Sequence, residues 1–216
     1  MTAMRARLRP LRGPGPVLSR EREESLTDRQ REILDELGRI FDKGFLDVTM
    51  AELAADVNCS LRTLYGLAGS RDELVTMVVD RNIRRVGRAA MRAITDDMTA
   101  LEAIRAYLSA ATVAVQCTTE EFARDIALLD TSNRLNASHS EYIIQVTRTL
   151  LDVAVEQGEI TPVDTMAVAR AIAGVGREFA RPDVMPTLAS SPKAAADLVV
   201  VVGLAGLRRR DVPPAS

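Results

Sequence analysis

The sequence predicts an all-α protein of about nine helices. Signals that start a helix recur at short intervals from residue 27 onward, and no segment shows the alternation of apolar and polar residues that marks a half-buried strand. The 216 residues are 47% hydrophobic and 27% charged. That composition supplies a sizeable core and excludes both a wholly disordered chain and a miniature fold built on disulfides.

Four segments have the capping-box form S/T-x-x-E/Q, in which a hydroxyl and a later side chain satisfy free backbone N–H groups at a helix start. The boxes begin at Thr27, Thr49, Ser70 and Thr99. An apolar stripe over residues 33–41 follows the first box, and Gly44 then stands where a left-handed helix cap is favoured. We therefore expect the first helix to end just before Gly44.

A helix, a tight turn and a second helix follow. The helix that Thr49 opens spans about two turns and ends near Val57, and Asn58 supplies the turn because asparagine tolerates positive φ better than most residues. Ser60 can then cap a short helix over Leu61–Tyr65. Prolines, glycines and further caps divide the rest of the chain into expected helices over Ser70–Arg92, Thr99–Val115, Glu120–Asn133, Ser138–Gln157, Asp164–Ala180 and Lys193–Arg208.

The net charge of −2 hides an uneven distribution. Residues 1–20 contain five arginines and no acidic residue, whereas residues 91–216 carry a net charge of −4. Prolines and glycines between residues 10 and 16 interrupt any helix there, and no apolar segment of a signal peptide follows Met1. We expect residues 1–26 to form a basic, disordered arm that can add phosphate or minor-groove contacts at low salt.

Two cysteines and one histidine limit the chemistry of the chain. Cys59 and Cys117 form no CxxC pair, and His139 alone cannot assemble a familiar zinc site. The longest apolar run, Leu198–Leu207, is about half the length that a bilayer requires. We therefore expect a cytoplasmic protein with no membrane segment, no metal and no cofactor.

The region from Phe41 to Leu74 carries the clearest functional signal. Four motifs follow one another in it: F-x-x-x-G-[FY], T-x-x-x-[IL]-A, the recognition-helix pattern V-S-x-x-T-[LIV]-Y, and S-K-x-x-L. The corresponding residues are Phe41, Gly44 and Phe45; Thr49, Leu53 and Ala54; Cys59, Ser60, Thr63, Leu64 and Tyr65; and Ser70, Arg71 and Leu74. In this order and spacing, the region resembles the helix-turn-helix DNA-binding domain of tetracycline-repressor-like (TetR-family) transcription regulators. The resemblance implies a second, helical domain for ligand sensing and dimerisation.

Two neighbouring positions depart from the family pattern. A buried Phe followed by Pro is usual just after the recognition helix, and this chain has Ala68 and Gly69 there. The loss of a buried Phe costs about 3–5 kcal/mol where nothing fills the space. We expect Leu67, or a residue of the helix after Ser70, to fill it.

The short helix that begins after Ser60 fits the major groove of DNA. Its exposed face is expected to carry Ser60, Leu61, Arg62, Thr63 and Tyr65, with Leu64 turned inward. Arg62 can make the bidentate contact to guanine, and Leu61 can touch a thymine methyl group. The residues better suited to phosphates are Thr49, Thr63, Tyr65 and Arg71. The alternative, a helical hairpin inside a larger bundle, is disfavoured by the order and spacing of the motifs.

The region after residue 91 is less specific. On the faces that point toward the core, its expected helices carry mostly apolar side chains and a few side chains that end in a polar group. A small-molecule pocket requires such a lining. The candidate effector contacts are Tyr107, Phe122, Ile126, Leu129, Asn133, His139, Tyr142, Val146, Val175 and Phe179. No Lys or Arg lies on those stripes, so a mainly apolar ligand is expected. The alternative, that each of these is an ordinary core residue, stays open.

The last two expected helices are apolar on several faces and must be covered. A homodimer through both would cover them and would present two recognition helices to successive major grooves. The sequence thus predicts a repressor, released from a palindromic operator by its ligand, with a DNA-binding domain at 27–90 and a ligand-sensing and dimerisation domain at 91–210. A ligand-independent architectural DNA-binding protein stays open, as does a small helical enzyme. The enzyme has less support because no phosphate loop, nucleophile elbow or HExxH motif is present.

Overall fold

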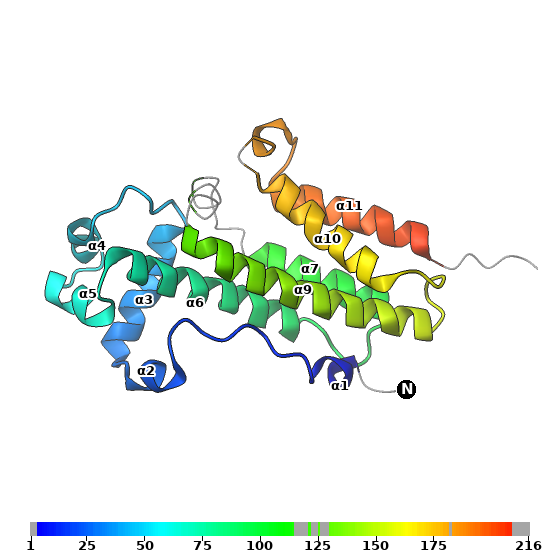
Figure 1. The fold of residues 1–216 in the computed structure, drawn as a ribbon, viewed down its shortest axis with the longest axis horizontal. Helices are drawn as coiled ribbons and strands as arrows, with labels where there is room; N and C mark the ends of the chain where they lie inside the picture. The colour runs from blue at the N-terminus through cyan, green and yellow to red at the C-terminus, as the bar shows by residue number, and fades with distance from the viewer. Residues whose placement is uncertain (1–3, 115–120, 122–124, 126–129, 182, 209–216) are drawn as a thin grey trace, which may run out of the picture. The chain divides into compact units, whose positions relative to one another are not determined.

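The computed structural model describes residues 4–114, 121, 125, 130–181 and 183–208. Within that part of the chain every regular element is a helix, apart from one isolated β-bridge between Ile160 and Arg208 (Figure 1). The all-α prediction is confirmed. None of the described helices is both long and apolar enough to cross a membrane.

The chain divides into two compact units. The N-terminal unit contains Pro14–Arg88 and Ala114–Ala137, and the C-terminal unit contains Met1–Gly13, Ala89–Val113 and Ser138–Ser216. Helix α6 (Arg71–Arg92) passes from the first unit into the second. Each unit has its own cluster of buried apolar side chains.

Short helices precede α6 in the N-terminal unit. They are α2 (Arg20–Ser25), α3 (Asp28–Phe41), α4 (Met50–Asp56) and α5 (Leu61–Leu67). The predicted capping boxes at Thr27 and Thr49 are both present, each with reciprocal hydrogen bonds to the residue three positions later. Asn58 has a φ of 48° and Gly44 a φ of 104°, so both predicted left-handed positions are confirmed.

The core of the N-terminal unit holds these short helices in place. The rings of Phe41 and Phe45 pack with centroids 5.3 Å apart. The buried side chains around them come from α3, α4, α5 and α6, and include Ile33, Leu34, Leu37, Leu53, Leu64, Leu74 and Val75. Helices of seven residues are unstable alone, so α4 and α5 depend on this packing.

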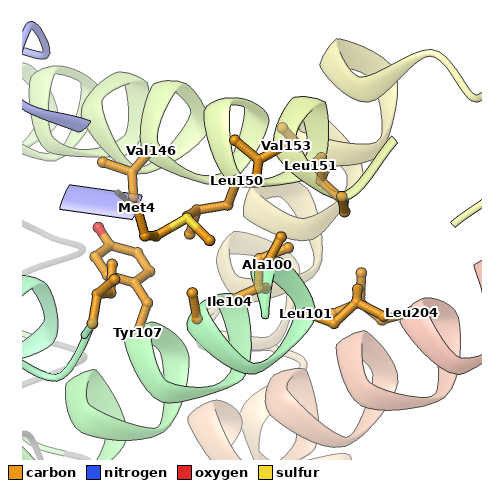
Figure 2. Close-up of a cluster of buried hydrophobic side chains, with 14 of the residues drawn as sticks. Met4, Ala100, Leu101, Ile104, Tyr107, Val146, Leu150, Leu151, Val153 and Leu204 are labelled. Atoms are coloured by element: carbon orange, nitrogen blue, oxygen red, sulfur yellow. The ribbon is translucent and has the colours of Figure 1, made fainter. Parts of the chain in front are cut away.

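The C-terminal unit is a second group of packed helices. Its helices are α1 (Met4–Leu8), α7 (Ala100–Ala114), the larger part of α9 (Asp130–Glu156), α10 (Thr165–Phe179), the 3-10 turn η1 (Met185–Thr187) and α11 (Pro192–Leu207). Asp164 and Ser191 are the N-caps of α10 and α11. Helix α10 packs against α11, and side chains of α7 and α9 face one another in the core (Figure 2).

The predicted break between residues 133 and 138 is wrong. Helix α9 starts at Asp130 and continues through Ser138 to Glu156. Residues 134–137 contain neither proline nor glycine, so no strong helix breaker separates the two predicted helices. Most of the helix predicted over Glu120–Asn133 lies outside the described residues.

The arm over residues 1–26 contains two short helices where we expected disorder. Helices α1 and α2 flank residues 11–16, which are not helical. Met4 and Leu8 are each 3% exposed, because a spacing of four residues places both on one face of α1 and the core of the C-terminal unit covers that face. The order of α1 therefore comes from long-range packing, which the local sequence pattern does not reveal.

Candidate nucleic-acid interface and effector region

Helix α5 turns Leu64 and Leu67 inward, leaves Leu61, Arg62 and Tyr65 exposed, and holds Thr63, predicted as exposed, half-buried. Leu64 is fully buried, as predicted. Leu61 and Tyr65 expose 44% and 53% of their surface, and Arg62 is also exposed. A guanidinium, an aliphatic group and a phenol on one short helix can contact a guanine edge, a thymine methyl group and a phosphate, respectively.

The hydroxyl groups of Thr49 and Ser60, near this face, also cap the N-termini of α4 and α5. Ser60 Oγ accepts a hydrogen bond from the backbone N–H of Thr63 at 3.1 Å, and the two hydroxyl oxygens lie 2.8 Å apart. Thr49 Oγ1 lies 2.8 Å from the Glu52 carboxylate, whose pKa is lowered by hydrogen bonds from the backbone N–H and then the hydroxyl of Thr49. A carboxylate beside Thr49 repels a phosphate. Ser60 therefore remains a better candidate for a DNA contact than Thr49.

The guanidinium of Arg71, predicted to contact a phosphate, donates to backbone carbonyls of the N-terminal unit. Its Nε donates to the carbonyl of Val48 at 2.6 Å, and its Nη2 donates to the carbonyls of Phe45 and Leu46. Its Nη1 lies 3.2 Å from a carboxylate oxygen of Asp72. Arg71 therefore ties the loop between α3 and α4 to the start of α6, and these contacts use most of its N–H donors.

The positions that depart from the TetR-family pattern are accommodated locally. Leu67 and Ala68 are each 3% exposed and belong to the core of the N-terminal unit, as we expected for Leu67. Gly69 donates its backbone N–H to the carboxylate of Glu73 at 2.8 Å, while Ser70 Oγ accepts from the backbone N–H of Glu73 at 3.1 Å. The predicted box at Ser70 is thus shifted by one residue on its carboxylate side.

Arg22 is a residue near the candidate interface that sequence reasoning missed. Its Nη2 donates to the backbone carbonyl of Gly66, in the last turn of α5, at 2.7 Å. Helix α2 is held in turn by Arg81, which pairs with Glu23. The expectation of a disordered arm hid this contact, because a single arginine carries no local signal for a partner 44 residues away.

Two of the predicted effector contacts are core residues of the C-terminal unit. Tyr107 is 4% exposed and Val146 is fully buried. Both face the side chain of Met4 in a cluster that also contains Ile104 and Leu150 (Figure 2). Burial, and to a smaller extent the neighbouring Tyr142, raises the pKa of the Tyr107 phenol, which keeps it protonated at neutral pH.

One polar candidate, Tyr142, lies at the edge of this cluster, and a second, His139, is near it in sequence. Tyr142 is half-buried and packs against the cluster, and burial raises the pKa of its phenol. A Cβ at Gly13 would lie 3.9 Å from ring carbons of Tyr142, so the backbone of the arm passes beside that ring. His139, one turn earlier on α9, is also half-buried.

The remaining effector candidates are placed less completely. Val175 and Phe179 are half-buried on α10. Phe122, Ile126, Leu129 and the side chain of Asn133 lie outside the described residues.

Helix α11 has an exposed apolar face. Leu198 and Val202 are each 65% exposed, and Val199 and Val201 expose 45% and 41% of their surface. The other side of the helix buries Ala196, Val200 and Leu204. Four exposed branched residues within five positions form a contiguous apolar strip of the kind that protein interfaces cover.

The sequence matches no protein-family model and no curated protein. The fold is similar to solved structures. A TetR transcription regulator from Haloarcula marismortui matches with a TM-score of 0.70 and 16% identity, covering 85% of this chain and 100% of that one. The TetR-family regulator PfmR from Thermus thermophilus matches with a TM-score of 0.59 and 23% identity, covering 82% and 99%. AibR in complex with isovaleryl coenzyme A and operator DNA matches with a TM-score of 0.54 and 19% identity, covering 81% and 97%.

Proposed function

We propose that this chain, which has the fold of TetR-family regulators, is a DNA-binding transcription regulator that acts as a homodimeric repressor. The observation that carries the proposal is the exposed face of α5, where Leu61, Arg62 and Tyr65 surround the buried anchor Leu64. We assign DNA binding to the N-terminal unit, and effector binding and dimerisation to the C-terminal unit. The complex of AibR with operator DNA supports this assignment by likeness of fold.

The proposed contacts divide into those that read bases and those that hold the backbone of DNA. Arg62 would make the bidentate contact to guanine O6 and N7, and Leu61 would pack on a thymine methyl group. Tyr65, Ser60 and Thr63 would bind phosphates, which set the register of the helix in the groove. Arg71 is not among the proposed contacts, because backbone carbonyls occupy its guanidinium.

A homodimer through α10 and α11 is part of the proposal. The strip of exposed apolar residues on α11 is its support, since a second copy of the same strip would cover it. A two-fold dimer places two recognition helices about 34–36 Å apart, so its operator has two inverted half-sites.

The proposed effector is a small, mainly apolar molecule that releases the repressor from DNA. A ligand can do so only if it prefers one conformation, because equal affinity for both shifts nothing. AibR has been solved with isovaleryl coenzyme A, which supports ligand response in a protein of this fold. Tyr142 and His139 are the polar groups proposed for such a ligand, since Tyr142 packs at the edge of the apolar cluster and His139 is half-buried one turn earlier on α9.

Selection of DNA from a random pool by the purified full chain tests the function. We expect enrichment of an inverted repeat with half-sites one helical turn apart. The variant Arg62→Ala should lose the preference for guanine at one position of each half-site, whereas Arg148→Ala, an exposed arginine of the C-terminal unit, should recover the same repeat. Enrichment of no sequence, or of one without two-fold symmetry, would reject the proposed repressor.

A further inference from the structure

The N-terminal segment over residues 4–11 occupies part of the region where effector contacts were predicted. Met4 and Leu8 are each 3% exposed, and Leu11 packs against the same cluster. The side chain of Met4 lies between Tyr107 of α7 and the Val146 and Leu150 side of α9 (Figure 2). The chain itself therefore covers the most apolar part of the candidate effector region.

Arg5 and Arg7 also make polar contacts that hold residues 4–11 against the C-terminal unit. The backbone N–H of Arg5 donates to Asp96 at 2.8 Å, and its Nε donates to the carbonyl of Ile94 at 2.9 Å. Arg7 pairs with Glu156 at 2.6 Å, with both side chains more than a third exposed. Solvent-exposed ion pairs contribute little to stability, so the two buried apolar side chains of α1 dominate the docking.

Two features of residues 4–11 favour their release while the rest of the C-terminal unit stays folded. A helix of five residues is not stable by itself, so α1 is ordered only while it is docked. Pro10 lies two residues after its last residue, Leu8, and residues 11–16 are not helical. Beyond this linker the chain is held again, in the N-terminal unit, where Arg84 donates to the carbonyl of Pro14 and the backbone N–H of Val17 donates to Asp80. Release of α1 would thus free a short tethered segment.

We propose that residues 4–11 are an internal occupant of the effector-binding face of α7 and α9, and that the effector binds there by displacing Met4 and Leu8. This inference rests on the proposed function and names the site at which the effector acts. The displaced groups are one unbranched thioether chain and one branched aliphatic chain. The matching ligand class is a neutral molecule with an aliphatic chain and one hydrogen-bonding group, which the Tyr107 hydroxyl can meet.

A displaced occupant has a measurable consequence for affinity. When only a fraction of molecules has the face free, the apparent dissociation constant of a ligand equals the intrinsic constant divided by that fraction. A substitution that weakens the packing of residues 4–11 should therefore tighten the binding of the ligand. A segment that formed one wall of the pocket would have the opposite effect, because its loss would remove ligand contacts.

The first test measures binding of Nile red, a neutral apolar dye, to the full chain by fluorescence. Leu8→Glu places a charge on the docked face, and Ala6→Glu places the same charge on an exposed position of the same helix. We expect Leu8→Glu to bind the dye at least tenfold more tightly than the wild type, and Ala6→Glu to stay within twofold of it. Unchanged or weaker binding by Leu8→Glu would overturn the proposal, as would no binding by any of the three proteins.

The second test needs no variant and remains informative if Leu8→Glu fails to fold. The amides of Arg9 and Leu11 donate to the carbonyls of Arg5 and Leu8, both at 3.0 Å. We expect hydrogen exchange at these two amides to accelerate at least tenfold when wild-type protein is saturated with Nile red. Unchanged or slower exchange overturns the proposal, including the case in which the dye binds the exposed face of α11 instead.

DNA selection with the same proteins separates this inference from the function on which it rests. Ala6→Glu and the wild type should enrich the same inverted repeat. A chain that enriches an inverted repeat but keeps α1 docked in the presence of dye retains the proposed function and loses the internal occupant. A chain that enriches no sequence loses the proposed function, whatever the dye does.

Discussion

Arg71 donates through Nε to the backbone carbonyl of Val48 at 2.6 Å, and this bond joins the start of α6 to the loop that precedes α4. An arginine that follows α5 in sequence thus holds a loop in place inside the N-terminal unit. The same guanidinium also serves the carbonyls of Phe45 and Leu46. The loop between α3 and α4 is thus held by Arg71 at its carbonyls and by Asp125, whose carboxylate accepts from the backbone N–H groups of Phe45 and Leu46.

Replacing Arg71 by Ala should destabilise the protein rather than change how it responds to salt on DNA. Each hydrogen bond from a charged donor contributes about 1.5–3 kcal/mol, and the substitution leaves several carbonyls without their partner. We expect a loss of at least that size in the free energy of unfolding, measured by urea denaturation. Arg62→Ala is the control and should unfold like the wild type. An Arg71→Ala protein of normal stability would contradict this role of Arg71.

Arg62→Ala should act on sequence preference instead. The side chain is exposed on α5, and a bidentate contact to guanine discriminates by about 1–3 kcal/mol. We expect that loss at one position of each half-site, with little change at other positions, in a competition assay across single-base operator variants. A uniform loss at every position would indicate that Arg62 binds a phosphate.

Val202→Glu should convert the protein from dimer to monomer. Val202 is 65% exposed on the apolar strip of α11, and a carboxylate buried in an interface made by that strip would lose its hydration without a counter-charge. Light scattering should give about twice the chain mass of 23.5 kDa for the wild type and the chain mass itself for the variant. Val17→Glu is the matched control, since Val17 is also exposed but lies in the arm. A wild-type monomer at micromolar concentration would reject the dimer.

Tyr107 and Tyr142 should differ in what they contribute to stability. Truncation of a buried aromatic residue to Ala costs about 3–5 kcal/mol, and Tyr107 is 4% exposed inside the core of the C-terminal unit. Tyr142 is half-buried at its edge. We expect Tyr107→Ala to lower the free energy of unfolding by that amount and Tyr142→Ala by clearly less. Equal losses would place Tyr142 in the core together with Tyr107.

The contribution of Glu52 to stability should vanish in acid. Hydrogen bonds from Thr49 lower the pKa of this carboxyl below its ordinary value of 4.5. A group whose pKa is lower in the folded state stabilises the fold above its unfolded pKa, and that stabilisation is lost as the pH falls through the folded pKa. The wild type should therefore be more stable than Glu52→Gln at pH 7, and the difference should shrink below pH 4.5, as thermal unfolding can show. A constant difference would mean that charge plays no part in this capping box.

Local physics made much of the N-terminal unit predictable. The capping boxes at Thr27 and Thr49, the positive φ of Asn58 and the inward turn of Leu64 follow from interactions among residues within four positions of each other. Short-range hydrogen bonds and helical periodicity can be recognised from the order of residue types alone. The orientation of the candidate recognition helix was therefore predictable, and with it the exposed position of Arg62.

What the sequence alone determined about this protein is its helical class, its helix starts in the N-terminal unit and the face that α5 exposes. Only the tertiary structure decided the role of Arg71, the burial of Tyr107 and the docking of α1. Arg71 meets carbonyls 23 to 26 residues away, and Arg5 meets Asp96 across 91 residues. A side chain's periodic position shows that it is buried or exposed, but not which distant group it will meet, because that partner is selected by how whole helices pack.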